Sequence, residues 1–122
     1  MNYRYNSHWI PKDFDRDYDA HIYFSAEDLD LIEKIQTKVR TAFPNSSVFV
    51  GDIIPEPIGP HPQPMLEINF TQDFFQVMLF WLIENREHLN VLVHPLTGND
   101  YWEHTQGAIW LGQSLQLDLS RF

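Results

Sequence analysis

The chain of 122 residues has no cysteine. Disulfide bonds are therefore excluded, and a bound metal would have nitrogen and oxygen ligands instead of thiolates. A reducing compartment is the usual location for such a composition, so we expect the protein in the cytoplasm. Residues 1–17 are polar and acidic without an apolar stretch, and no signal peptide is expected.

Basic residues are scarce: 8 Lys and Arg stand against 17 Asp and Glu, which gives a formal charge of −9. They are scattered from Arg4 to Arg121, so nucleic acid and anionic membrane surfaces are poor partners. Long hydrophobic runs are absent too. The longest, Phe74 to Ile83, is interrupted by Gln76 and is far shorter than the ~20 residues that a membrane-spanning helix needs.

Hydrophobic residues make up 43% of the chain and aromatic residues 15%, enough for the core of a single domain over residues 1–122. We expect residues 1–18 to form an irregular arm. Apolar periodicity in the rest predicts the order strand, helix, strand, strand, helix, strand. The strands are expected at 20–24, 48–50, 65–70 and 90–94, with one helix capped by Ser25 and stopped at Pro44 and another from Thr71 to about Asn85.

The order βαββαβ predicts an α+β, ferredoxin-like sandwich, in which an antiparallel sheet of strand order 4-1-3-2 carries both helices on one face. Leucines alternate with polar residues from Ser114 to Ser120, which predicts an additional carboxy-terminal strand. Residues 51–64 contain five prolines and should form a stiff exposed loop. The second helix is apolar nearly all round, which predicts a subunit contact and hence a homodimer.

Side chains alternate between the two faces of a strand, so the face of each residue follows from its position. If the even-numbered residues of strand 20–24 meet the helices, His21 and Tyr23 point to the helix-free face. The same parity places Glu67 and His94 there, and the strand order brings His94 beside His21. Two histidines and a carboxylate are the ligands of the facial triad that binds non-haem Fe(II).

Two more histidines lie in loops that can reach this face. His61 stands in the sequence Gly-Pro-His-Pro, where the prolines present the side chain rigidly. Its loop leaves the opposite end of the sheet, so His61 reaches the site only if the loop folds back or a neighbouring subunit delivers it. His104 follows the fourth strand and can reach the same pocket.

Short motifs follow one another from about Tyr18 to Leu119. They are Tyr18-Asp-Ala-His21-Ile-Tyr-Phe24, Ile58-Gly-Pro-His61-Pro62, Met65-Leu-Glu67-Ile-Asn69, Val93-His94-Pro95-Leu-Thr97, His104-Thr-Gln106 and Trp110-Leu-Gly112. In this order and spacing they resemble the DOPA 4,5-dioxygenase family of small proteins related to a fungal pigment enzyme. The resemblance implies extradiol cleavage of a catechol such as DOPA, in which O2 opens the ring beside its two hydroxyls at a non-haem Fe(II). Another divalent metal such as zinc can replace the iron in purified protein.

The functional positions of that family correspond to His21, His61, Glu67, His94 and His104 in this chain. We expect all of them except His104 to bind the metal. His104, with Tyr23, is expected to be catalytic, taking the second catechol proton and later returning a proton. The partners would be a small aromatic diol and O2.

Other interpretations stay open. One alternative is a ferredoxin-like module that binds a small molecule or metal without catalysis. Another is a cofactor-free monooxygenase of the dimeric α+β type, in which the histidines act only as bases. His21 alone can be a core histidine, Glu67 a cross-strand ion pair and Tyr23 a packing residue, while His8 and His88 are expected to be solvated. A bound divalent metal disfavours the monooxygenase, and turnover with oxygen uptake excludes the binding module.

Overall fold

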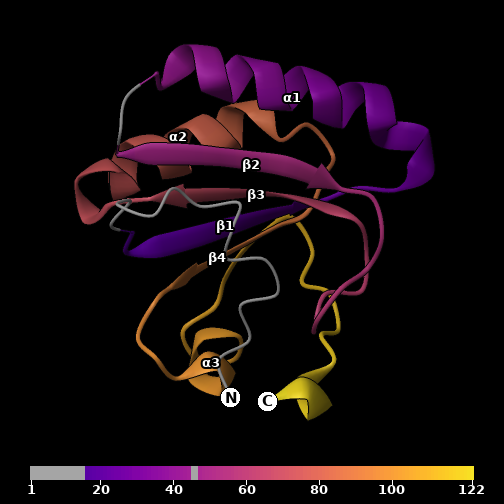
Figure 1. Cartoon of the computed structure of the whole chain (residues 1–122), viewed down its shortest axis with the longest axis vertical. Coiled ribbons are helices and arrows are strands. Elements are labelled where there is room, and N and C mark those ends of the chain that lie inside the picture. Colours follow the sequence, from indigo (N-terminus) through magenta and orange to yellow (C-terminus); the bar gives the residue numbers. More distant parts are fainter. Residues whose placement is uncertain (1–15, 45–46) are drawn as a thin grey trace.

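The computed structural model describes residues 16–44 and 47–122, which are built around a five-stranded antiparallel sheet (Figure 1). The strand order is β2-β3-β1-β4-β5, so the predicted order of four strands is present with a fifth strand beside β4. This confirms the predicted fold class. The strands are β1 Tyr18–Tyr23, β2 Val48–Ile54, β3 Met65–Phe70, β4 Val91–Pro95 and β5 Ile109–Leu111. The α-helices are α1 Leu29–Ala42, α2 Phe75–Asn85 and α3 Asp100–Glu103, with 3-10 turns at Ala26–Asp28, Gln72–Phe74 and Leu119–Arg121.

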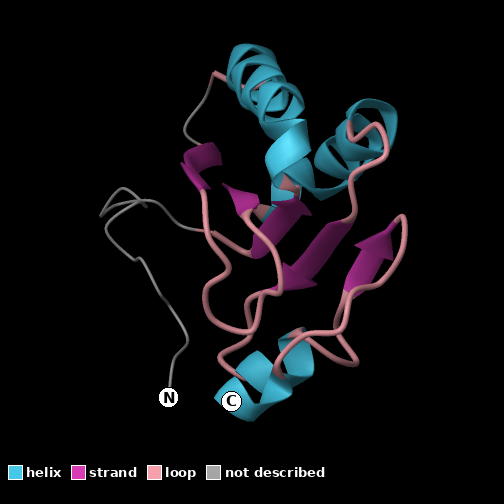
Figure 2. Ribbon diagram, turned by 90° about the vertical axis from the view of Figure 1, so that its right-hand side faces the viewer, coloured by secondary structure: helices cyan, strands magenta, loops and turns pink. Residues whose placement is uncertain are grey.

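Both long helices lie on one face of the sheet, as Figure 2 shows. In α1, Ile32, Ile35 and Val39 recur at three- and four-residue steps and are buried. They belong to one core cluster with the even-numbered residues of β1 and β3, among them Ile22 and Ile68. Full burial of each such side chain contributes roughly 1.5–3 kcal/mol, so this face fixes the strands that carry the site.

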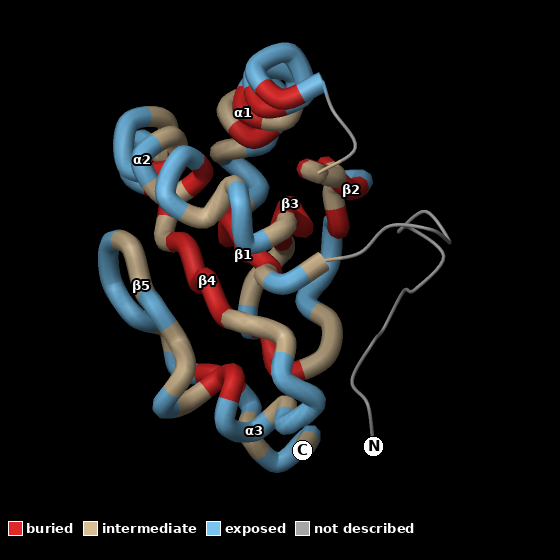
Figure 3. Tube along the Cα trace, turned by 90° about the vertical axis from the view of Figure 1, so that its left-hand side faces the viewer, coloured by how far each residue is buried: buried red, intermediate tan, exposed pale blue. Residues whose placement is uncertain are grey.

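The other face of the sheet has a smaller apolar cluster, formed by Tyr23, Ile54, Met65, Leu92 and Leu117. The odd-numbered residues of β1 and β3 point to this face, as strand parity predicted. The face is nevertheless not open. Ile58 of the proline-rich loop and leucines of the carboxy-terminal segment pack against the cluster, and β4 is buried along most of its length (Figure 3).

The prediction of a strand at residues 114–120 is wrong, because this segment is irregular up to the 3-10 turn at Leu119–Arg121. The position beside β4 is taken by β5, and Gly112, with φ of +83°, turns the chain away after it. Leu117 then joins the cluster of the helix-free face, and Leu115 and Leu119 pack against it. Their alternation therefore reflects the packing of an irregular segment rather than strand pairing.

The proline-rich loop is shorter and less exposed than predicted. β2 continues through a bulge between Val50 and Ile53 and ends at Ile54, so the loop begins at residue 55. Within it Pro60 and His61 are buried. The arm predicted for residues 1–18 falls outside the described residues up to residue 15, and Tyr18 already belongs to β1.

The helix α2 uses only part of its apolar surface within the chain. It buries Met78 and Leu82, whereas Val77, Phe80 and Ile83 are 51%, 59% and 53% exposed. In residues 16–44 and 47–122, no helix has both the length and the apolar character needed to cross a membrane.

Candidate metal centre and active site

Four histidines from distant parts of the chain lie together on the helix-free face. His21 is on β1, His61 in the loop before β3, His94 on β4, and His104 directly after α3. The ring centroid of His21 lies 4.3 Å from that of His61 and 5.2 Å from that of His94, and the rings of His94 and His104 are 4.4 Å apart. All four are buried. The loop of His61 folds back over the sheet, so the chain itself supplies this residue.

The Nε2 atoms of His21 and His94 face each other at 3.1 Å. Nδ1 of His94 donates to the carbonyl oxygen of Pro95 at 2.9 Å, so a neutral His94 has its lone pair on Nε2. Nδ1 of His21 is 3.6 Å from Oε1 of Glu67 and has no hydrogen-bond partner among the described residues. Whichever nitrogen of neutral His21 carries the proton, its lone pair faces a second acceptor, either His94 or the carboxylate.

A cation bound by both Nε2 atoms removes this conflict. Two nitrogens held 2.0–2.1 Å from one metal are about 2.8–3.4 Å apart at octahedral to tetrahedral angles, and the observed 3.1 Å falls in that range. His104 can complete the set, because ligand atoms of His21, His94 and His104 lie within 4.8 Å of one another. Nδ1 of His104 donates to the carbonyl oxygen of Asp100 at 2.7 Å, which makes Nε2 its ligand atom. The residues therefore fit a divalent metal.

Buried carboxylates surround the histidines. Asp19, Glu67 and Glu103 are 2%, 7% and 0% exposed. Asn69 donates to Asp19 and, at 2.8 Å, to Glu67, and Nη1 of Arg16 lies 3.4 Å and 3.5 Å from the same two carboxylates. Three carboxylates and one guanidinium give the centre an excess of negative charge, which favours a bound cation.

Two of the histidines, His21 and His61, are held neutral by burial. Burial lowers the pKa of His21 well below its usual value near 6.5, and the nearby histidines and Arg16 lower it further. Burial lowers the pKa of His61 in the same way, with smaller contributions from His104 and His94. Neutral imidazole is the form that binds a metal.

His61 forms a buried pair with Tyr23, whose hydroxyl is 2.7 Å from Nδ1 of His61. Burial, assisted by the charge of Glu67, raises the pKa of the Tyr23 phenol far above its usual value near 10. The hydroxyl therefore keeps its proton and can donate a hydrogen bond to Nδ1, and in that arrangement the neutral His61 carries its own proton on Nε2. The pair can offer a proton from Nε2.

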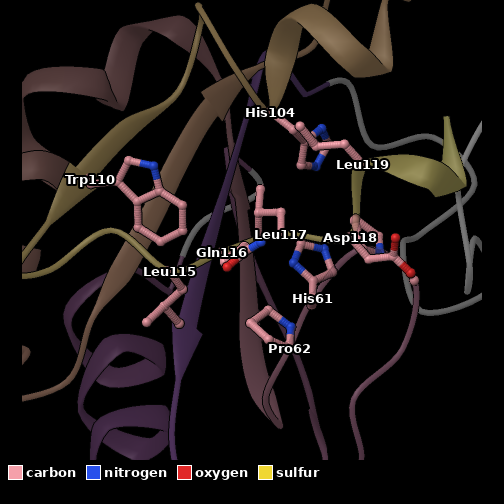
Figure 4. A pocket seen from close by; sticks show the side chains of 11 residues that line it. His61, Pro62, His104, Trp110, Leu115, Gln116, Leu117, Asp118 and Leu119 are labelled. Atoms are coloured by element: carbon pink, nitrogen blue, oxygen red, sulfur yellow. The ribbon is translucent and has the colours of Figure 1, made fainter.

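A cavity of about 870 Å³ lies beside His61 and His104, which both line it (Figure 4). Trp110, Leu115 and Leu117 contribute apolar surface. Among the residues that the structure describes, Asp118 is the only charged one in the lining. The volume suits a small organic molecule, and the apolar walls suit an aromatic ring.

The residues predicted from the sequence are close neighbours: His21, His61, Glu67, His94 and His104 gather on one face, and Tyr23 contacts His61. His88 is exposed and bonded to Asp28 at 2.9 Å, and His8 lies outside the described residues.

Sequence reasoning missed Asp19, Arg16 and Glu103. Asp19 has the same strand parity as His21, and this signal was present. Arg16 lies in the segment that was predicted to be an irregular arm. Glu103 lies in α3, whose four residues are too few for a recognisable helical period.

Several known proteins are similar to this chain in sequence or in fold. A sequence model described as the Dopa 4,5-dioxygenase family matches residues 18–121. The chain is 39% identical over 114 residues to an uncharacterized 21.2 kDa protein of Botryotinia fuckeliana, covering 84% of this chain and 61% of that protein. It is 37% identical over 65 residues to a DOPA 4,5-dioxygenase of Amanita muscaria, covering 53% of this chain and 28% of that enzyme. The chain thus spans less than two thirds of the length of these relatives.

The crystal structure of a "putative dioxygenase" from Nostoc punctiforme superposes with a TM-score of 0.74 at 35% sequence identity. The superposition covers 86% of this chain and 89% of the other. The two proteins therefore have the same fold over almost their whole length.

Proposed function

The chain belongs to the Dopa 4,5-dioxygenase family, and we propose that it is an extradiol dioxygenase that opens the ring of a catechol with non-haem Fe(II) and O2. The observation that carries this proposal is the close approach of the Nε2 atoms of His21 and His94. No tautomer of neutral His21 gives hydrogen bonds to both of its neighbours, His94 and Glu67, and a divalent metal bound between the two Nε2 atoms would remove this conflict. The cavity lined by His61 and His104 has the size for a small aromatic diol, and Trp110, Leu115 and Leu117 give it apolar surface.

We assign the metal to His21, His94 and His104. Glu67 stands behind His21, facing Nδ1 while Asn69 donates to its other oxygen, so it would hold the His21 ring in place. Relative to the expectation from the sequence, His61 and His104 exchange roles, because a hydrogen bond from Tyr23 to Nδ1 would leave the proton of His61 on Nε2, the nitrogen that would otherwise bind the metal. When bound, the metal supplies Lewis acidity that lowers the pKa of the catechol hydroxyls.

His61 is the proposed proton donor. Tyr23 holds the proton of His61 on Nε2, and His61 lines the cavity where the diol would bind. The donor can then give this proton to an oxygen of the substrate as the ring opens. A general acid of this kind typically accelerates a reaction about 10²- to 10⁴-fold.

The decisive experiment is turnover. Protein loaded anaerobically with Fe(II) is mixed with catechols and air, and oxygen uptake is recorded together with the absorbance of the product. Extradiol cleavage gives a yellow muconic semialdehyde. His94→Ala should take up no oxygen, and the matched control His88→Ala should behave as the wild type.

Each other outcome supports a different function. Cleavage between the two hydroxyls would refute the extradiol reaction. Metal binding without oxygen uptake would favour a small-molecule or metal-binding module, and oxygen uptake by the metal-free protein would favour a cofactor-free monooxygenase.

We further propose that two chains associate through α2 and that the protein is cytoplasmic. The exposed side chains of Val77, Phe80 and Ile83 would be covered by the second copy. The absence of cysteine suits a reducing compartment.

A further inference from the structure

Glu103 is a buried carboxylate that the proposed reaction does not use. It is 0% exposed and occupies the last position of α3. A carboxylate taken out of water is costly unless its oxygens are bonded or face a positive or polarised group. The contacts of its two oxygens therefore indicate what the residue does.

One oxygen of Glu103 holds the chain that follows β4. Oε2 accepts hydrogen bonds from the backbone N–H of Thr97 at 2.6 Å, from the Thr97 hydroxyl at 3.0 Å and from the backbone N–H of Gly98 at 3.0 Å. These bonds close the turn between β4 and α3. The side chain therefore has a fixed orientation.

The other oxygen faces His94. Oε1 lies 3.6 Å from Nδ1 of His94 and has no hydrogen-bond partner among the described residues. Nδ1 of His94 already donates to the carbonyl oxygen of Pro95. A carboxylate beside this N–H favours the same proton position and increases the electron density that His94 can offer at Nε2.

Glu103 also adjoins His104 in the sequence. His104 is held by its bond from Nδ1 to the carbonyl oxygen of Asp100, at the start of the same short helix. A residue that fastens α3 to the end of β4 thus sets the separation of His94 and His104, whose rings are 4.4 Å apart.

We propose that Glu103 is a positioning residue that orients His94 and joins His94 and His104 into one metal-binding unit. This rests on the proposed metal centre, but it assigns a role to a residue outside the ligand set. A purely structural role would stabilise the fold without changing the affinity of the folded protein for a metal.

The test is Co(II) binding by the full chain, followed by absorption spectroscopy and by competition with a chelator. In Glu103→Gln the amide oxygen can still accept from Thr97 and Gly98, but the charge facing His94 is lost. We expect the Co(II) affinity to fall about 10- to 100-fold, while exposed Glu84→Gln changes nothing. Equal affinity in folded Glu103→Gln and wild type would overturn the proposal. Failure of the wild type to bind Co(II) would instead refute the metal centre.

A second measurement does not depend on the folding of a variant. Long-range ¹H–¹⁵N spectra of the metal-free wild-type protein report which nitrogen of each histidine carries the proton. The proposal requires the His94 proton on Nδ1, facing Glu103 and Pro95. A His94 proton on Nε2 would overturn it.

Discussion

Acidification should destabilise the metal-free protein well before its carboxylates begin to titrate. In the folded chain the pKa values of His21 and His61 lie well below 6.5, whereas in the unfolded chain they should return to about 6.5. Below pH 6.5 the unfolded state therefore binds more protons, and the free energy of unfolding falls as the pH falls. Above about pH 7 both states have neutral imidazoles, and these two residues cause no pH dependence.

The size of the effect follows from the number of groups. One histidine contributes about 1.4 kcal/mol per pH unit, so two contribute about 2.7 kcal/mol per unit. Between pH 7.5 and 5.0 the loss approaches about 4 kcal/mol, a large share of the roughly 5–15 kcal/mol that stabilises a domain. Below about pH 5 acidic side chains also titrate and obscure the slope.

Urea denaturation in the presence of a chelator, at several pH values between 7.5 and 5.0, measures this slope. His61→Gln removes one of the two groups and should halve it, whereas His88→Gln, at an exposed site, should leave it unchanged. A free energy of unfolding that stays constant from pH 7 to 5 would mean that the imidazoles are not buried as neutral groups, and the reasoning would fail.

Three further predictions concern the metal, the donor pair and the interface. His94→Ala should lose stoichiometric metal, measured by elemental analysis of the folded protein, whereas His88→Ala should keep it; full occupancy in His94→Ala would refute the centre. Tyr23→Phe removes the hydroxyl that bonds Nδ1 of His61, so we expect a loss of about 1–3 kcal/mol in urea denaturation and a lower kcat at unchanged metal content. An unchanged kcat would argue against the donor pair. Phe80→Asp should convert dimers into monomers in sedimentation velocity, an expectation that a monomeric wild type at micromolar concentration would contradict.

The sequence predicts the sheet and the residues on it well, because strand parity is a geometric property. His21, Glu67 and His94 lie on three adjacent strands, and the helices cover the opposite face, so alternation alone assigns them to one surface. The same reasoning includes Asp19, which pairs with His94 across β1 and β4.

The parts that escaped prediction depend on contacts between distant segments. The alternation of leucines in residues 114–120 is the same as in a strand. These residues do not form one because β5 already pairs with β4 and leaves no edge of β4 for them to join. The return of His61 over the sheet depends on tertiary contacts, such as the bond from the N–H of Asp118 to the carbonyl oxygen of Pro60. The role of Glu103 depends on a turn between β4 and α3 that no periodicity reveals.

The six residues of β1 serve two different purposes on the two faces of the sheet. Ala20 and Ile22 belong to the core under the helices, whereas Asp19, His21 and Tyr23 belong to the chemistry of the other face. Random substitution along this strand would therefore produce two kinds of damage in alternation. Changes at 20 and 22 would reduce the amount of folded protein in a cell, changes at 19 and 21 would act mainly on the proposed metal centre, and changes at 23 would do both, because Tyr23 also belongs to the apolar cluster of that face. Evolution can consequently alter the reactivity of this protein by changing every second residue of a strand while the fold is inherited unchanged.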